Sequence, residues 1–166
     1  VDLVPQRLAV ATKMGAERVF CPGESRMEEV VDEWSGGLGA DAVLICVGGK
    51  GAVVTEAAVA ALRDRGVMVI VGIYDVELPW RSACMKDIQV RYSRSYGPGR
   101  YDPEYEWAGK DYPVGYVRWT ENRQFEACLH LMKSGVLDLR PVTTREVRFE
   151  EVVPVYESLL QPENAD

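Results

Sequence analysis

Apolar residues near the start of the chain recur at helical spacing. Residues 5–14 carry a proline in the first turn and place Leu8 and Ala11 on one face, and Gly15 follows as a stop. This pattern predicts a helix over 5–14. Residues 18–20, closed by the Cys-Pro-Gly of 21–23, are a candidate for a short strand after it.

The next segment carries a signal for the start of a second helix. Ser25 and Glu28 are spaced as a capping box, in which the serine and glutamate side chains satisfy each other's free backbone amides. The helix predicted from them ends at the glycines between 36 and 39. Its apolar stripe consists of Met27, Val30, Val31 and Trp34.

Two unbroken apolar runs flank a helix of small residues. The runs DAVLICV (41–47) and VMVIVGI (67–73) are typical of strands buried on both faces, as in a parallel sheet. The helix predicted between them covers 51–65 and ends at Gly66. Strand, helix and strand with short glycine connections predict a βαβ unit with a right-handed crossover.

The pattern changes after this unit. Alternating apolar and polar residues over 88–95 predict an edge strand with one polar face. Residues 97–119 are rich in Tyr, Gly and Pro and have little periodicity. Because they are too aromatic for a flexible linker, we expect an ordered loop packed on a surface.

Helical spacing returns near the C-terminus. Thr120 is expected to cap a helix that ends at Gly135. A strand is predicted over 142–149 and a final helix over 150–160. Together with the βαβ unit, these elements predict the α/β class with a parallel sheet.

Composition and charge narrow the classes of partner. With 166 residues the chain has the length of one domain, and 47% hydrophobic and 27% charged residues are average for a globular protein. The net charge of −7 is opposite in sign to the surface that nucleic-acid binding needs. No apolar run approaches the ~20 residues of a membrane helix. We therefore expect neither nucleic acid nor a membrane as a partner.

The chain has four cysteines without a CxxC pair and one histidine, His130. A structural zinc ion needs four clustered thiolates or imidazoles, so we expect this chain to bind no zinc. We interpret His130 as solvent-facing or structural, and the cysteines as reduced thiols of a cytoplasmic protein. The cysteines are Cys21, Cys46, Cys84 and Cys128.

In an open parallel sheet, ligands bind beyond the carboxyl ends of the strands. That rule selects Asp2, where a carboxylate can bind the hydroxyls of an adenosine ribose, and Arg7 one turn later. The strand ends that it selects are Val47, Gly48 and Gly49, then Val71, Gly72 and Ile73, and then Ser93 to Ser95. Glycine there allows a ligand to approach the backbone, and serine hydroxyls can donate to a carboxamide. On spacing alone, an ordinary surface acid, connection glycines and exposed serines remain alternatives.

No pairing of a nucleophile with a base is visible in the sequence. Ser–His–Asp and Cys–His spacings are absent, and so are a GxGxxG turn and a phosphate loop. Carboxylates in the aromatic loop offer acid–base groups, but a solvated acidic loop is the simpler interpretation. They are Asp102, Glu104, Glu106 and Asp111. The residues by themselves thus indicate a binding platform and no mechanism.

Three segments resemble the nucleotide-binding half of medium-chain, zinc-type alcohol dehydrogenases: VDLVPQRLAVATKMGAERVF, GADAVLICVGG and RGVMVIVGIY. The segment SYGPGRYDPEYEWAGKDYPVGYVRWTENR resembles a subgroup of bi-domain oxidoreductases, in which this module is joined to a second oxidoreductase domain and associated with surface-polysaccharide or sugar metabolism. The resemblance covers nearly the whole chain. It implies hydride transfer between NAD and an alcohol, a carbonyl compound or a sugar-like substrate.

The resemblance also implies a role for each selected residue. Asp2 would hold the adenosine ribose with Arg7 beside it, and an acid at this position favours NAD over NADP because it repels a 2′-phosphate. The fourth and fifth strand ends would line the nicotinamide side, and the backbone of the sixth strand would meet the carboxamide. These strand-end residues are Val47, Gly48, Val71, Gly72, Ser93 and Ser95. No catalytic residue and no metal ligand is implied for this chain.

The chain departs from the family pattern at its start. The resemblance places Val1 at the end of the second strand of the order 3-2-1-4-5-6, without the first strand, its GxGxxG turn and the catalytic domain. We therefore expect an incomplete doubly wound parallel sheet, with a partial NAD-binding domain over 1–97. A C-terminal α+β segment over 98–166 would return toward the absent catalytic domain. A truncated or separately expressed piece of this kind should bind NAD weakly and should not turn over substrate.

Unpaired strand edges invite pairing with another chain, so we expect a homodimer. Two further hypotheses remain open at this point. The remnant fold can serve as a non-catalytic interaction or assembly module, because the chain lacks catalytic residues. Alternatively, the parent enzyme can be a quinone-reductase-like relative that uses no zinc.

Overall fold

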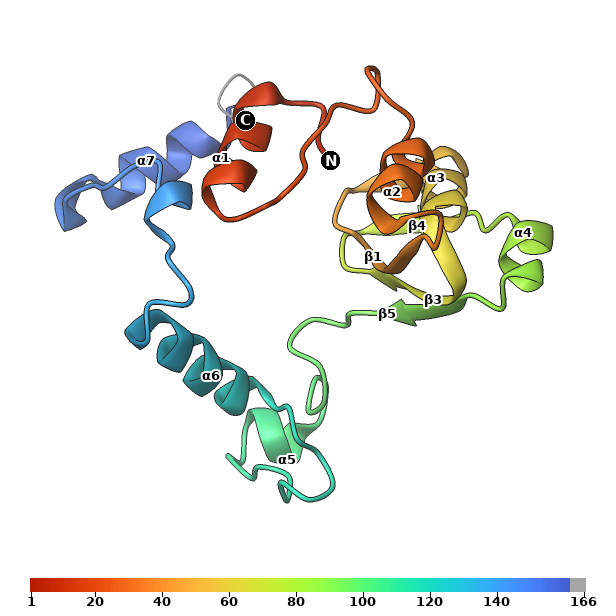
Figure 1. The fold of residues 1–166 in the computed structure, drawn as a ribbon. Helices are drawn as coiled ribbons and strands as arrows, with labels where there is room; N and C mark the ends of the chain where they lie inside the picture. The colour runs from red at the N-terminus through yellow and green to blue at the C-terminus, as the bar shows by residue number, and fades with distance from the viewer. Residues whose placement is uncertain (162–166) are drawn as a thin grey trace.

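The structure, a computed structural model, describes residues 1–161, and the end of the predicted C-terminal segment, 162–166, lies outside the described residues. The sheet at the centre of the described chain has the strand order β1–β3–β5 (Figure 1). Its strands are β1 (Ala40–Ile45), β3 (Leu62–Ile70) and β5 (Gln89–Tyr92). The parallel sheet predicted from the apolar runs is confirmed, although each strand ends earlier than expected.

The strands are aligned in register. Val67 of β3 lies opposite Ala42 of β1 and Gln89 of β5, and the pairing continues without a shift to Ile70. Because all of these strands run parallel, their carboxyl ends meet at one edge of the sheet. A ligand site of the parallel-sheet type therefore belongs at this edge, which we term the carboxyl edge.

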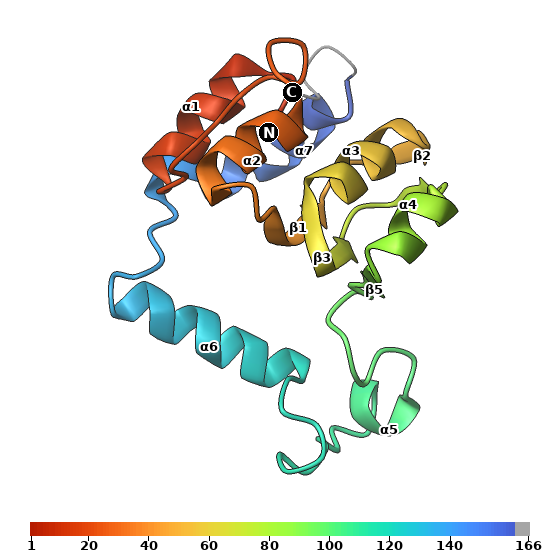
Figure 2. The ribbon, with the colours of Figure 1, turned by 45° about the vertical axis from the view of Figure 1, so that its right-hand side comes forward.

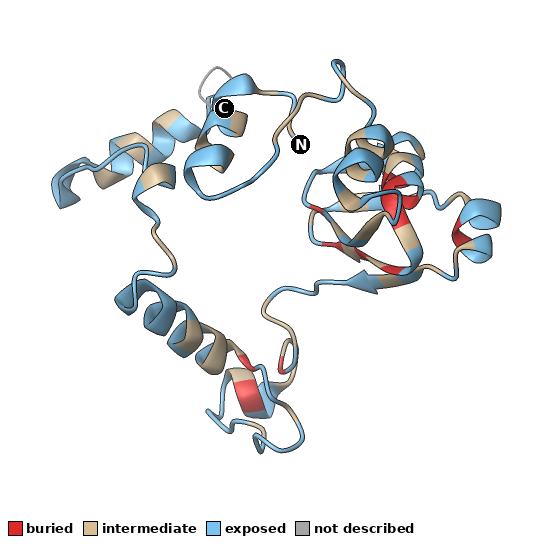
Figure 3. Ribbon diagram, viewed as in Figure 1, coloured by how far each residue is buried: buried red, intermediate tan, exposed pale blue. Residues whose placement is uncertain are grey.

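Helices α2 (Met27–Ser35) and α3 (Val53–Ala61) pack together and cover one face of the sheet (Figure 1). Met27 and Val54 contact a core of buried side chains below them. That core consists of Ile45, Ala58, Val59, Leu62, Met68, Ile70 and Ala83. Figure 3 shows most buried residues in this part of the chain, so the sheet and its two helices carry most of the hydrophobic stabilisation.

The opposite face of the sheet has no covering helix among the described residues. The apolar runs predicted strands buried on both faces, and this prediction is wrong for the described chain: Leu44 is 62% exposed and Val71 is 46% exposed. Side chains alternate across a strand, so Ile45 and Ile70 point into the core while their neighbours point to the open face. The open face is therefore apolar and solvent-accessible.

A second parallel pairing joins β2 (Gly49–Gly51) and β4 (Tyr74–Val76) beyond the carboxyl ends of β1 and β3. The Tyr74 hydroxyl donates a hydrogen bond to the carbonyl oxygen of Gly51 at 2.8 Å. The sequence pattern does not predict these strands, because each is three residues long and β2 is mostly glycine. These short strands continue the pairing between the segment that follows β1 and the segment that follows β3.

Helix α4 (Trp80–Met85) is a further element that the pattern does not predict. Directly after it, Lys86 reaches the end of α3. Its Nζ donates to the carbonyl oxygens of Val59, Ala60 and Leu62 at 2.9, 2.8 and 2.6 Å. Because the last carbonyls of a helix have no partner within it, this cation caps α3 and fixes its junction with β3.

Two predictions near the N-terminus are wrong. Residues 18–20 run as irregular chain, because no neighbouring strand pairs with them among the residues described. Helix α2 begins at Met27, and the residue before it, Arg26, makes no side-chain capping bond. The capping box predicted from Ser25 and Glu28 does not form, since the Arg26 guanidinium pairs with the Glu28 carboxylate.

The first and last helices lie in one part of the molecule, away from α6 (Figures 1 and 2). Helix α1 (Pro5–Lys13), which confirms the helix predicted there, packs on the 3₁₀ turn η1 (Arg140–Val142). A second 3₁₀ turn, η2 (Phe149–Glu151), leads into α7 (Val152–Leu159). The strand predicted over 142–149 is wrong, because this segment is irregular between the two turns.

The loop predicted over 97–119 is ordered and contains a short helix, α5 (Pro103–Glu106). Helix α6 (Glu121–Lys133) begins directly after Thr120, as predicted. The Thr120 hydroxyl does not cap this helix and instead donates to Asp111 Oδ2 at 3.4 Å. Every helix within residues 1–161 is too short or too polar to traverse a bilayer.

Candidate functional site

The carboxyl edge gathers the strand-end residues selected from the sequence. They are Val47, Gly48, Val71, Gly72 and Ser93. Backbone hydrogen bonds tie these ends together: the amides of Val71 and Gly72 both donate to the carbonyl oxygen of Ile45, at 2.9 and 3.0 Å. The Ser93 amide donates to the Ile70 carbonyl oxygen at 2.9 Å. The structure therefore confirms that these residues lie at one edge of the sheet, and this edge is the candidate site.

Gly72 lies where the chain leaving β3 passes closest to the chain leaving β1. A Cβ at Gly72 would lie 2.1 Å from the carbonyl oxygen of Val47, so no residue with a side chain fits there. Gly48 is less crowded, because its Cβ would lie 3.6 Å from the Ile73 carbonyl oxygen. With Val47 and Val71 about half exposed, the edge presents bare backbone that a flat ligand can approach closely.

Ser93 and Ser95 follow β5, and both are exposed. Their hydroxyls are therefore accessible to a ligand at the carboxyl edge. Ser95 adopts a left-handed φ of +45°, and the amide of Gly97 donates to the carbonyl oxygen of Arg94 at 2.7 Å. This tight turn ends the strand and starts the segment from 94 to 124, which we term the aromatic segment.

Asp2 and Arg7 belong to a different part of the structure. Asp2 stands directly before α1, where its Oδ1 accepts a hydrogen bond from the Val4 amide at 2.9 Å. Arg7 is an exposed residue of α1. Because α1 packs on η1, contacts with the C-terminal part of the chain position both residues. The structure thus groups the strand-end residues with one another and places Asp2 and Arg7 with α1.

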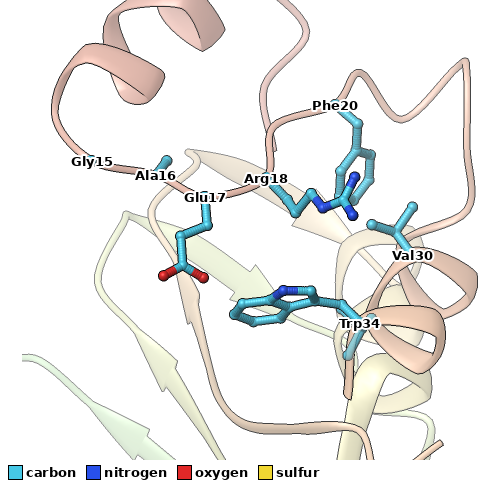
Figure 4. Close-up of a pocket in the computed structure, with 8 residues that line it drawn as sticks. Gly15, Ala16, Glu17, Arg18, Phe20, Val30 and Trp34 are labelled. Atoms are coloured by element: carbon cyan, nitrogen blue, oxygen red, sulfur yellow. The ribbon is translucent and has the colours of Figure 1, made fainter. Parts of the chain in front are cut away.

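A hollow of about 460 Å³ lies between the chain that follows α1 and helix α2 (Figure 4). Its apolar walls include Phe20, Val30 and Trp34, and Trp34 is 62% exposed. In Figure 4, Glu17 and Arg18 lie on the irregular segment beside the Trp34 indole. None of the predicted cofactor residues lines this hollow, so it is separate from the carboxyl edge.

The aromatic segment is organised around the carboxylate of Glu106. This group accepts hydrogen bonds from the Tyr96 hydroxyl, from Arg100 Nη1 at 2.8 Å and from the Tyr101 amide at 3.0 Å. These donors, the Tyr96 hydroxyl foremost, lower the pKa of Glu106 to about 2. Glu106 is therefore an ionised structural acceptor and a poor general acid.

The other carboxylates of the aromatic segment are also engaged. Asp102 accepts a hydrogen bond from the Glu104 amide at 3.0 Å at the start of α5, and another from the Tyr112 hydroxyl, which lowers the pKa of Asp102. Asp111 pairs with Arg123 at 3.0 Å. The interpretation of this segment as a solvated acidic loop is therefore wrong for Asp102 and Glu106, whose side chains hold the loop together.

No metal-binding centre is visible in the described part of the chain. Across residues 1–161, no group of three or more His, Cys, Asp and Glu side chains is placed to hold a metal ion. His130 is exposed near the end of α6. The free cysteines are Cys21, Cys46, Cys84 and Cys128, and they come from separate elements.

A single methyl group at Gly72 tests the geometry of the carboxyl edge. We expect Gly72→Ala to lower the free energy of unfolding by about 1–3 kcal/mol, because the new Cβ collides with a backbone oxygen that the Ile45 contacts hold in place. Urea denaturation measures the change. The matched control is Gly48→Ala, whose Cβ meets only ordinary contacts and should cost about 0.5 kcal/mol or less. Equal effects of the two substitutions would contradict the close approach.

The low pKa of Glu106 predicts an acid-sensitive aromatic segment. Because folding lowers this pKa from an ordinary 4.5 to about 2, the carboxylate contributes its full stabilisation above about pH 4.5. That contribution is lost as the pH falls through about 2. A ¹³C NMR titration of the Glu106 carboxyl group should show a midpoint near 2, and Glu106→Gln should remove the step. A midpoint near 4.5 would show that the hydrogen bonds do not form.

Comparison with known proteins gives a family context. Residues 1–110 match the family model described as zinc-binding dehydrogenase. An alcohol dehydrogenase of Rhizobium meliloti is 29% identical over 143 residues, which cover 85% of this chain and 41% of that protein. D-xylulose reductase A of Aspergillus oryzae is 34% identical over 107 residues, 61% of this chain and 29% of that protein. The chain thus spans at most about two fifths of the length of these relatives.

Solved structures with the same fold include 2R,3R-butanediol dehydrogenase from Bacillus subtilis. It superposes with a TM-score of 0.68 at 21% identity, over 98% of this chain and 40% of that one. Alcohol dehydrogenase TADH from Thermus sp. ATN1 gives a TM-score of 0.62 at 22% identity, over 94% of this chain and 38% of that one. The predicted α/β fold class with a Rossmann-like parallel sheet is confirmed, although within residues 1–161 helices cover only one face of the sheet.

Proposed function

Because this chain belongs to the zinc-binding dehydrogenase family, we propose that it forms the cofactor-binding portion of a nicotinamide-dependent oxidoreductase. The observation that carries the proposal is the carboxyl edge, where Gly48 and Gly72 leave the backbone bare beside two parallel strand ends. At Gly72 the space that a side chain would need is taken by the Val47 backbone, so glycine lets the two strand ends lie this close and present backbone to a flat ring. The cofactor would supply the hydride chemistry, and this chain would supply position and electrostatics.

The strand ends receive the nicotinamide half of the cofactor in this proposal. The backbone at Val47 and Gly48 and at Val71 and Gly72 lines the nicotinamide side. Ser93, with Ser95 beyond it, meets the carboxamide through its backbone. Support comes from the hydrogen bonds that tie the three strand ends into one edge, and from the exposure of the serines.

Asp2 holds the adenosine ribose in this proposal, with Arg7 beside it. The Asp2 bond to the Val4 amide uses one carboxylate oxygen, and a ribose hydroxyl can donate to the other. A negative charge at this position repels the 2′-phosphate of NADP, so NAD is the proposed cofactor. The placement of Asp2 directly before α1 supports this assignment.

A small alcohol or carbonyl compound, sugar-like in kind, is the proposed substrate of the parent enzyme. The printed names of two relatives, an alcohol dehydrogenase and a D-xylulose reductase, support that class. We further propose a division into a partial cofactor-binding domain over 1–97 and a C-terminal segment over 98–166. We expect this chain to hold the cofactor weakly, because its sequence contains no GxGxxG turn to bind the pyrophosphate.

A second candidate function is an interaction or assembly module that forms a homodimer. The open apolar face favours it, and so does β1, which has a partner strand on only one side among the described residues. Light scattering separates the candidates when it is combined with cofactor binding. A dimer that shows no NAD binding would favour the module, whereas NAD binding would favour the enzyme part.

Calorimetric titration with NAD tests the proposed function. We expect millimolar affinity for the full 166-residue chain and no turnover of alcohols. Asp2→Ala should weaken NAD binding about tenfold, because it removes a charged acceptor for the ribose. The control is Asp2→Asn, which keeps an oxygen for the Val4 amide but loses the charge, and it should narrow the preference for NAD over NADP. Micromolar affinity in the unmodified chain, or equal binding of NAD and NADP, would contradict the account.

A further inference from the structure

The turn that follows β5 is the most basic stretch at the carboxyl edge. Residues 91–101 hold three arginines and no acidic residue, in a chain whose net charge is −7. Ser93, which the proposed function places at the nicotinamide carboxamide, lies within this stretch. The local positive charge is therefore at the proposed nicotinamide end of the cofactor, whereas Asp2 marks the adenosine end.

Within this stretch, Arg94 is fixed in position without an acidic partner. Its Nη2 donates to the carbonyl oxygen of Arg100 at 2.5 Å, and its guanidinium carbon lies 5.1 Å from the centroid of the Tyr101 ring. In the part of the chain that the structure describes, no carboxylate pairs with it. A guanidinium carries five N–H donors, and Arg94 is exposed, so donors remain for a ligand.

The platform under Arg94 is a strained residue held by Glu106. Tyr101 has a left-handed φ of +69°, which is unfavourable for a residue with a large side chain. The Glu106 carboxylate holds Tyr101 in this conformation by accepting a hydrogen bond from the Tyr101 amide at 3.0 Å. The other guanidinium on this ring, that of Arg100, lies 4.2 Å from its centroid and pairs with Glu106 at 2.8 Å. Of the two arginines that stack on the Tyr101 ring, Arg100 is thus paired with a carboxylate. The positive charge of Arg94 remains for a ligand.

We propose that Arg94 binds an oxyanion of the substrate, a carboxylate or a phosphate group. The planar guanidinium fork matches both groups, and its stacking on Tyr101 orients the fork before a ligand arrives. The substrate class is therefore a small anionic alcohol or carbonyl compound, such as a sugar acid or a sugar phosphate. This inference rests on the proposed function, because the latter places the reacting end of the cofactor at Ser93.

The phosphates of the cofactor are a second source of the same oxyanion chemistry. They lie between the two riboses of a dinucleotide, away from the carboxamide that Ser93 and Ser95 would meet. Arg94 lies between these serines in the sequence, and the proposed function would therefore put it at the nicotinamide end of the cofactor. Its position therefore favours the substrate as the source of the oxyanion, and competition with NAD separates the two.

The experiment titrates the full 166-residue chain with inorganic phosphate and follows the arginine side-chain Nε–Hε signals by NMR. We expect the Arg94 signal to shift and saturate. Arg94→Gln should weaken phosphate binding about 10- to 100-fold, and Arg94→Lys should keep part of it, because an ammonium has the charge without the fork. The matched control is Arg118→Gln: Arg118 is also exposed and lies 4.4 Å from the Trp119 ring centroid, and its loss should change nothing.

The arms of the experiment separate this inference from the proposed function. Phosphate that still binds at saturating NAD supports a substrate site, whereas phosphate displaced by NAD assigns Arg94 to the cofactor and overturns the inference. NAD binding without a saturating Arg94 shift overturns the inference and leaves the proposed function standing. Phosphate binding without any NAD binding overturns the proposed function and the substrate assignment with it. Equal losses in Arg94→Gln and Arg118→Gln would also overturn the inference.

Discussion

The close passage of Gly72 beneath the Val47 carbonyl oxygen is the contact on which the candidate site depends. It brings the chain leaving β3 against the chain leaving β1, and the Ile45 carbonyl oxygen fixes it by accepting two amides. Any side chain at Gly72 would separate these segments. The result is a sheet edge whose surface is backbone, which is what a flat cofactor ring needs for close approach.

The residues proposed to bind the two ends of the cofactor are held in place in different ways. At the nicotinamide end, the aromatic segment builds a platform whose shape depends on one ionised carboxylate, Glu106, and its hydroxyl, guanidinium and amide donors. At the proposed adenosine end, Asp2 accepts a local hydrogen bond from the Val4 amide before α1. The charges differ as well, because the proposed ribose end carries both Asp2 and Arg7, whereas residues 91–101 carry arginines and no acid.

The sequence predicts elements whose signal is local and fails where a partner decides the structure. The apolar runs before Gly48 and Gly72 identify the strands, although one face of the sheet is open in the described chain. Residues 18–20 have strand composition but no strand beside them, and so they stay irregular. The role of Glu106 was missed for a related reason: its donors lie five to ten residues away in a segment without periodicity. The tyrosines of this segment are the feature of the sequence that could have pointed to the role of Glu106.

The central claim is that NAD binds at the carboxyl edge. Mapping backbone amide shifts by NMR while NAD is added to the full chain tests it most directly. The account predicts the largest shifts at Gly48, Gly72 and Ser93, with smaller shifts at Asp2. Shifts concentrated around Trp34, in the hollow between α2 and the chain that follows α1, would contradict it.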